Sequence, residues 1–230
     1  VNATMQSIQS VTFPALSKIS DNPMKFDEGY RRVLMLTAFI MLPVMTGLIA
    51  TADDIYMLLL KPQWHPAIPY FRIMCLIGIF YPISAIAYNV LKVRSNGAII
   101  LRLEIIKKVI MTIILATTIP ISVMAIAWGM VAAAACEMVL NIGATLRYAG
   151  LKLKSLVTTL LPIIALTAAM YLATEMVGSQ IENLAVGLRL VIKIGVGIIS
   201  YTAISFITRM EAFDEALAIA KQFLNKQNKD

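Results

Sequence analysis

Long runs of apolar residues, separated by short polar segments, set the pattern of this sequence. The clearest run covers residues 33–52 and holds 20 residues without a charged side chain. At a rise of about 1.5 Å per residue, it forms a helix of roughly 30 Å, the thickness of a bilayer's hydrocarbon core. Similar runs, which the pattern predicts to be five further membrane-spanning helices, cover residues 70–91, 101–120, 124–142, 156–176 and 185–207.

The two ends of the chain complete the predicted domain organisation. Residues 1–16 carry no charge but are too short to span, so we interpret them as a partial transmembrane helix. Residues 17–32 form a cytoplasmic loop, residues 33–207 a six-span bundle, and residues 208–230 a cytoplasmic, helical tail. The chain begins without an initiator Met or a signal-peptide pattern, so we expect a piece of a longer polypeptide.

Composition supports the same class of protein. The chain is 59% hydrophobic and only 14% charged, and its mean hydropathy is +0.80, whereas soluble domains are about half apolar and about a quarter charged. The net charge of +7 comes from cations scattered over several loops, which does not predict a nucleic-acid partner. Cys75 and Cys136 both lie within spans, at different predicted depths, so we interpret them as packing residues.

The distribution of Lys and Arg predicts the orientation of the spans. Along the chain, successive loops and the tail hold four, one, five, none, three, none and four of these cations. Loops rich in Lys and Arg remain on the cytoplasmic side of a membrane. The first loop and the C-terminus are therefore predicted to be cytoplasmic, and membrane lipids are the surroundings of the bundle.

Several short patterns, in their order and spacing, resemble one known family. The patterns are Phe13-Pro14-Ala15-Leu16-Ser17, Tyr30-Arg31-Arg32, Lys61-Pro62-Gln63-Trp64, Pro66-Ala67-Ile68-Pro69, and Leu103-Glu104-Ile105-Ile106-Lys107-Lys108. Together they resemble the C-terminal half of the bacterial polysaccharide (O-antigen or capsule) flippases of the MOP superfamily, mostly over residues 10–150.

The resemblance implies an all-α, polytopic transmembrane helix bundle, with six full spans plus the partial N-terminal one. This bundle would be the second of two in a MOP-type carrier of the bacterial inner membrane, and its partner would be the missing N-terminal half of the same polypeptide. The implied substrate is an oligosaccharide linked to undecaprenyl diphosphate, moved across the membrane for polysaccharide or lipopolysaccharide biosynthesis. The resemblance implies no cofactor, and H⁺ or Na⁺ is a possible coupling ion.

Ionisable residues within spans are costly and mark candidate sites. In an antiparallel hairpin that turns at Ser122, Glu137 lies level with Lys107, and Lys108 is adjacent. Asn141, four residues after Glu137, extends the same polar stripe. One interpretation is a structural ion pair, and the other is a cation-lined vestibule that meets the diphosphate, with Glu137 as partner or coupling-ion site.

The last span carries Arg189 and Lys193 on one face, because they are four residues apart. We expect them either to snorkel outward or pair with Glu175 or Glu182, or to form an anion-attracting stripe. Arg102 is a further candidate, for anionic headgroups or the substrate.

Other positively charged or acidic positions have simpler interpretations. Arg72 anchors its span at the interface. Asp53 and Asp54 could take part in metal–diphosphate chemistry, but acids at an outer helix end are ordinary, and we favour this simpler interpretation.

Other functional classes have less support in the sequence. There is one histidine, His65, and no metal site or catalytic motif is recognised, so we do not predict an enzyme. A MATE-like exporter of small molecules remains an alternative, although it favours acidic cavities. A membrane glycosyltransferase or polymerase of the same pathway is a second alternative, although the outer loops are short for such an enzyme. A truncated relic without transport activity is a third.

Overall fold

The chain folds into long α-helices, as its apolar runs predict. The computed structural model describes residues 23–148, 150 and 152–218, and these contain no β-strand. The predicted partial helix at residues 1–16 lies outside the described residues. The elements are α2 (Pro23–Ala50), α3 (Ala52–Leu59), the 3₁₀ helix η1 (Pro62–Ala67), α4 (Ile68–Arg94), α5 (Gly97–Thr118), α6 (Val123–Tyr148), α7 (Leu153–Gln180) and α8 (Val186–Ile207).

Five of the predicted spans are long and apolar enough to cross a membrane, namely α2, η1 with α4, α6, α7 and α8. The sixth, α5, has 22 residues, the same length as α8. It differs from the others because Arg102, Glu104, Lys107 and Lys108 lie near its middle, so that the longest uncharged stretch within its bounds is residues 109–118. The protein is therefore an all-α, multi-pass membrane protein.

The helix of the first span extends further toward the N-terminus than the apolar run predicted. α2 starts at Pro23, so the second half of the predicted loop at residues 17–32 is helical. Phe26 and Tyr30 are buried and continue the four-residue spacing of the core positions in the span, which explains the extension. At the other end, Thr51 separates α2 from the short helix α3.

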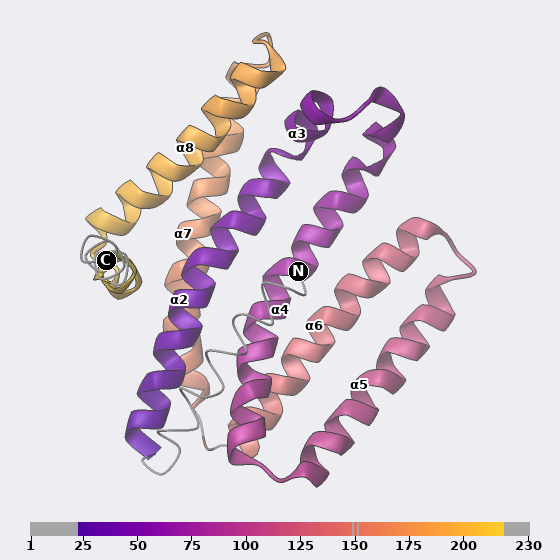
Figure 1. Ribbon diagram of the computed structural model, residues 1–230, viewed down its shortest axis with the longest axis vertical. Coiled ribbons are helices and arrows are strands. Elements are labelled where there is room, and N and C mark those ends of the chain that lie inside the picture. Colours follow the sequence, from indigo (N-terminus) through magenta and orange to yellow (C-terminus); the bar gives the residue numbers. More distant parts are fainter. Residues whose placement is uncertain (1–22, 149, 151, 219–230) are drawn as a thin grey trace, which may run out of the picture.

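The helices form a bundle with α2 and α4 in its middle (Figure 1). α7 packs on α2 and α8, while α6 packs on α4 and carries α5 on its other side. α5 makes nearly all of its helix contacts with α6, so it stands at the edge of the bundle. Cys75 in α4 is buried and Cys136 in α6 is exposed, and both are free thiols.

The core lies where α2, α4 and α7 meet. Phe26, Tyr30, Leu34, Ala38 and Leu42 repeat every four residues and form one buried face of α2. Opposite them are buried residues of α4 and α7, namely Ile83, Ile86, Val90, Leu156, Ile163, Leu166 and Met170. In lipid, this face is stabilised mainly by close packing, because lipid tails are as apolar as the side chains.

The start of the tail packs on α2. Residues 211–218 are helical. Arg31 binds both carboxylate oxygens of Glu211, at 2.7 and 2.8 Å. Arg32 donates to Glu215 at 3.0 Å. The described part of the charged tail is thus held at the N-terminal end of α2. Residues 219–230 of the tail lie outside the described residues.

Candidate functional site

The hairpin of α5 and α6 positions the first group of ionisable side chains. Its helices begin at capped residues: the Asn96 side chain accepts a hydrogen bond from the Ile99 amide at 3.1 Å, and Ser122 Oγ accepts one from the Ala125 amide at 3.0 Å. Such side chains satisfy amides that have no partner within the helix. The turn before α6 brings the middle of α6 level with the charged part of α5, as predicted.

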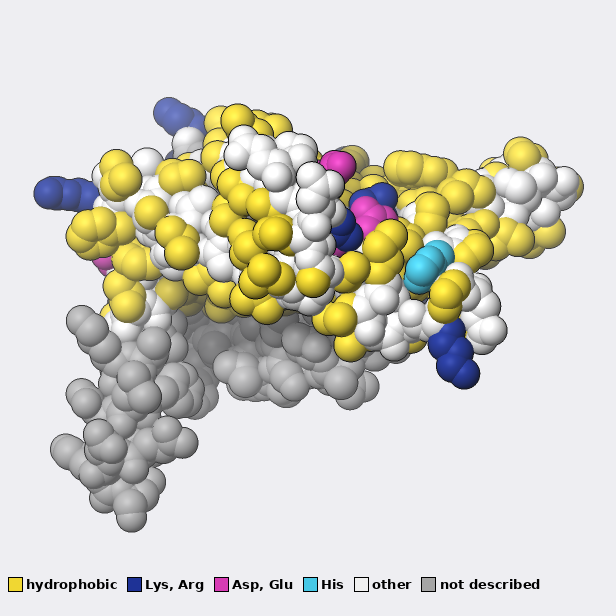
Figure 2. Space-filling view, turned by 90° about the horizontal axis from the view of Figure 1, so that it is seen from above, with side chains coloured by type: hydrophobic (Ala, Val, Ile, Leu, Met, Phe, Trp, Pro, Cys, Tyr) yellow, Lys and Arg dark blue, Asp and Glu magenta, His cyan; other side chains and the backbone are white. Residues whose placement is uncertain are grey.

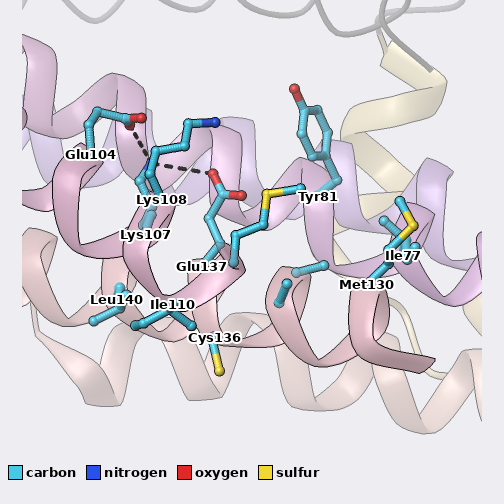
Figure 3. A pocket seen from close by; sticks show the side chains of 13 residues that line it. Ile77, Tyr81, Glu104, Lys107, Lys108, Ile110, Met130, Cys136, Glu137 and Leu140 are labelled. Carbon is cyan, nitrogen blue, oxygen red and sulfur yellow. Dashed lines mark hydrogen bonds and ion pairs between the residues drawn. The ribbon is translucent and has the colours of Figure 1, made fainter. Parts of the chain in front are cut away.

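Lys107 is the centre of this group and joins the two helices. Its amino group lies 3.3 Å from Glu137 Oε1 on α6, and it also pairs with Glu104, one turn earlier on α5. The Lys107 side chain is only 9% exposed, whereas those of Glu104 and Glu137 are 35% and 41% exposed. Figure 3 shows both ion pairs meeting at Lys107. The predicted proximity of Glu137 and Lys107 is confirmed.

A cavity of about 180 Å³ lies beside these charges. Glu104, Lys107, Lys108 and Glu137 line it on one side, and Tyr81 of α4 and apolar side chains of α5 and α6 line the rest. The hairpin is also linked to α4 near this point. Lys107 Nζ lies 4.5 Å from the centre of the Tyr88 ring, a cation–π contact that joins α5 to α4.

The cavity carries balanced charges, since it has two lysines and two glutamates. This differs from the cation-lined vestibule that the sequence suggested. Lys107 is occupied by both carboxylates. Lys108 is exposed and, within the described part of the chain, forms no ion pair, so it is the cation free to meet an anion. Arg102 is exposed as well, but it does not line the cavity.

Asn141 does not extend this polar group, so the prediction of one continuous stripe is wrong for this residue. Asn141 is 1% exposed, and its amide donates to Ser84 Oγ of α4 at 2.8 Å. Thr145, one turn later, donates to the Ala87 carbonyl at 2.9 Å. Four residues advance a side chain about 40° around a helix. At Asn141 this rotation directs the side chain to Ser84 of α4, the helix that packs against α6, so Asn141 serves helix packing.

A second group of charges joins α3 to α8. Asp54 is completely buried, at 0% exposure. It pairs with Arg189 and also with Lys193, whose amino group lies 3.0 Å from its Oδ2. The side chains of these two cations are 15% and 11% exposed. The expectation that Glu175 or Glu182 would be their carboxylate partner is wrong, because Asp54 takes this place.

The break at Thr51 explains how this second group forms. It puts Asp53 and Asp54 in the first turn of α3, where carboxylates are favoured by the helix dipole. Asp53 points the other way and binds Arg72 of α4 at 2.6 Å. The two acids therefore fasten α3 to α4 and to α8. Figure 2 shows acidic and basic side chains gathered together on this end of the molecule, among hydrophobic ones.

The path of Lys193 depends on a glycine of the neighbouring helix. A Cβ atom at Gly178 of α7 would lie 2.6 Å from Lys193 Cε, too close for an ordinary contact. The Lys193 chain therefore lies against the bare backbone of α7. Its amino group also lies 3.4 Å from the Ala50 carbonyl oxygen, at the end of α2. Apart from the acids at a helix end, nothing in the sequence indicates this arrangement.

No group of three or more His, Cys, Asp and Glu side chains able to hold a metal ion occurs among the described residues. The two charged groups can instead bind anions or exchange ion-pair partners. Neither contains a histidine, and their three acids, Glu104, Glu137 and Asp54, are all paired with Lys or Arg.

Comparison with known proteins points to polysaccharide biosynthesis. Residues 1–69 match the model of a family described as polysaccharide biosynthesis protein. Over 100 residues, 44% of this chain and 20% of the relative, the chain is 23% identical to the lipopolysaccharide biosynthesis protein WzxC of Escherichia coli (strain K12). It is 25% identical, over 45% of this chain and 21% of the relative, to an uncharacterized membrane protein in the cps region of Klebsiella pneumoniae. These matches cover about a fifth of either relative, and they confirm the resemblance to the polysaccharide flippase family.

Proposed function

We propose that this protein takes part in moving a lipid-linked oligosaccharide, carried on undecaprenyl diphosphate, across the bacterial inner membrane. The similarity to a lipopolysaccharide biosynthesis protein carries this proposal. It is supported by the multi-pass helical fold and by charged groups placed between apolar helices. In this proposal the chain is the second bundle of a MOP-type carrier, with a cytoplasmic C-terminus.

The work of such a carrier is binding and release, without covalent chemistry. Carriers of this kind alternate between two arrangements as one helix bundle moves against another around a central site. The cavity beside Lys107 and Lys108 is our candidate for contact with the diphosphate. Lys108 supplies the free positive charge, and Lys107 is held in place by Glu104 and Glu137. Glu137 is also the candidate for a coupling ion, because its side chain remains 41% exposed.

A reconstituted transport assay tests this proposal. The protein, expressed from its complete reading frame, is placed in lipid vesicles with a fluorescent oligosaccharide linked to undecaprenyl diphosphate. An impermeant quencher then measures how fast the probe changes leaflet. Wild-type protein is expected to accelerate this exchange, and failure to do so would overturn the proposed function.

Two matched variants on α5 test the site. Lys108→Gln removes the free cation of the cavity, and Arg102→Gln removes an exposed cation outside it. A hydrogen bond to a charged group contributes about 1.5–3 kcal/mol, so Lys108→Gln should slow exchange by roughly 10- to 100-fold. Arg102→Gln should leave the rate near that of wild type. Equal rates for the two variants would refute the role of Lys108.

A further inference from the structure

A larger cavity, of about 370 Å³, lies between α2, α7 and α8. Met170 and Thr174 of α7 form its floor, and α2 and α8 form its walls. Val44 and Ile198 line it and are 50% and 60% exposed. The cavity is therefore a groove that opens on the apolar outer surface of the bundle, where membrane lipid meets the protein.

Two glycines keep this groove wide. A Cβ atom at Gly47 of α2 would meet no atom within 4 Å. One at Gly197 of α8 would meet Thr174 Oγ1 at 3.5 Å, an ordinary contact. Close helix packing therefore does not explain either glycine, although each is about 1 kcal/mol less favourable than alanine within a helix. Their effect is to leave room between α2 and α8.

The length of the groove matches one leaflet of a membrane. Along α8 its lining extends from Lys193 to Thr202, a stretch of ten residues that covers about 14 Å of helix. This is close to half of a hydrocarbon core of about 30 Å. Lys193 marks the end of the groove nearer α3, because its amino group pairs with Asp54 of α3. An undecaprenyl chain is much longer than such a groove, whereas an acyl chain of a phospholipid fits it.

The charge at the α3 end favours an anionic lipid. Asp54 offers one negative charge to Arg189 and Lys193, so the group carries one excess positive charge. Of the residues that line the groove, Lys193 alone is charged. We propose that the groove holds one acyl chain of an anionic phospholipid, with the phosphate of that lipid at Lys193. This lipid would be a resident of the protein, distinct from any carried substrate.

Competitive lipid binding tests this proposal. The full-length protein is purified in detergent with equal amounts of phosphatidylglycerol and phosphatidylcholine of identical acyl chains, and the retained lipids are counted by native mass spectrometry. Wild-type protein should retain phosphatidylglycerol about fivefold better, as expected for one cation at a membrane surface. Equal retention of the two lipids would overturn the proposal.

Three variants separate the groove from the charge. Gly47→Leu fills the groove and should lose the bound lipid, whereas Gly143→Leu, on the exposed side of α6 and also without atoms within 4 Å of its Cβ position, should retain it. Lys193→Gln leaves Asp54 paired with Arg189, so it should keep lipid but lose the preference for phosphatidylglycerol. Equal retention by the two leucine variants would refute the groove. If Gly47→Leu does not fold, an unchanged headgroup preference in Lys193→Gln refutes the proposal by itself.

Discussion

Removal of the Asp54 carboxylate should destabilise the protein far more than removal of its neighbour Asp53. Asp54 is at 0% exposure, and its two partners, Arg189 and Lys193, are at 15% and 11%. Asp54→Ala leaves two cations with little access to water and no carboxylate between them. Breaking a buried ion pair by removing one partner costs about 3–5 kcal/mol, and we expect a loss of this size.

Asp53→Ala provides a matched control, because it removes the same chemical group one residue away on the same helix. The pair that it breaks, with Arg72, is 41% and 40% exposed. Exposed pairs contribute about 0–1 kcal/mol because water screens them. The difference between the two variants should therefore be at least about 2 kcal/mol.

The free energy of unfolding can be measured by denaturant titration in mixed detergent micelles, with helix content by circular dichroism as the readout. A third variant carries Asp54→Leu, Arg189→Leu and Lys193→Leu together, so that no buried charge is left unpaired. Apolar replacement of a whole buried charge group is often neutral or stabilising, so this variant should recover most of the loss. Equal losses of stability for Asp54→Ala and Asp53→Ala, or a triple variant less stable than Asp54→Ala, would refute this reasoning.

Two buried hydrogen bonds give further predictions. Asn141→Ala removes the donor to Ser84 Oγ between α6 and α4. It should lower the free energy of unfolding by about 1–3 kcal/mol, because a buried polar group loses its partner. The same titration measures this loss, and a loss smaller than that of an exposed Lys152→Ala control would contradict the prediction. Tyr201→Phe removes the hydroxyl that donates to the Phe39 carbonyl at 2.8 Å. It should cost about 1 kcal/mol, and an unchanged midpoint would show that the hydroxyl contributes nothing.

The spans and the first charged group could be predicted because both depend on local spacing. A run of apolar residues fixes the length of a helix, and a tight turn fixes which residues of two neighbouring helices lie at the same level. Lys107 and Glu137 belong to one hairpin with a short turn at Ser122, so counting residues from the turn places them together. The same count, without the rotation of α6, misplaced Asn141.

The second charged group could not be predicted because it depends on which distant helices are neighbours. Asp54 and Arg189 are separated by 135 positions in the sequence, and charge patterns along a chain do not specify how six spans are arranged around one another. The contacts of α3 with α8, and the 2.6 Å pair of Asp53 with Arg72, result from this arrangement. The acids at the start of α3 were visible in the sequence, but their burial was not.

The two charged groups differ in a way that separates stability from transport. Asp54 is fully buried and fastens α3 to α8. The Lys107 group instead joins α6 to α5, the helix at the edge of the bundle that packs almost entirely on α6, and its carboxylates are 35% and 41% exposed. Water near these carboxylates lowers the energy of breaking and remaking their ion pairs. A change at Glu137 should therefore alter transport with little loss of stability, whereas a change at Asp54 should reduce stability first. Comparable losses of stability at both sites would contradict this division.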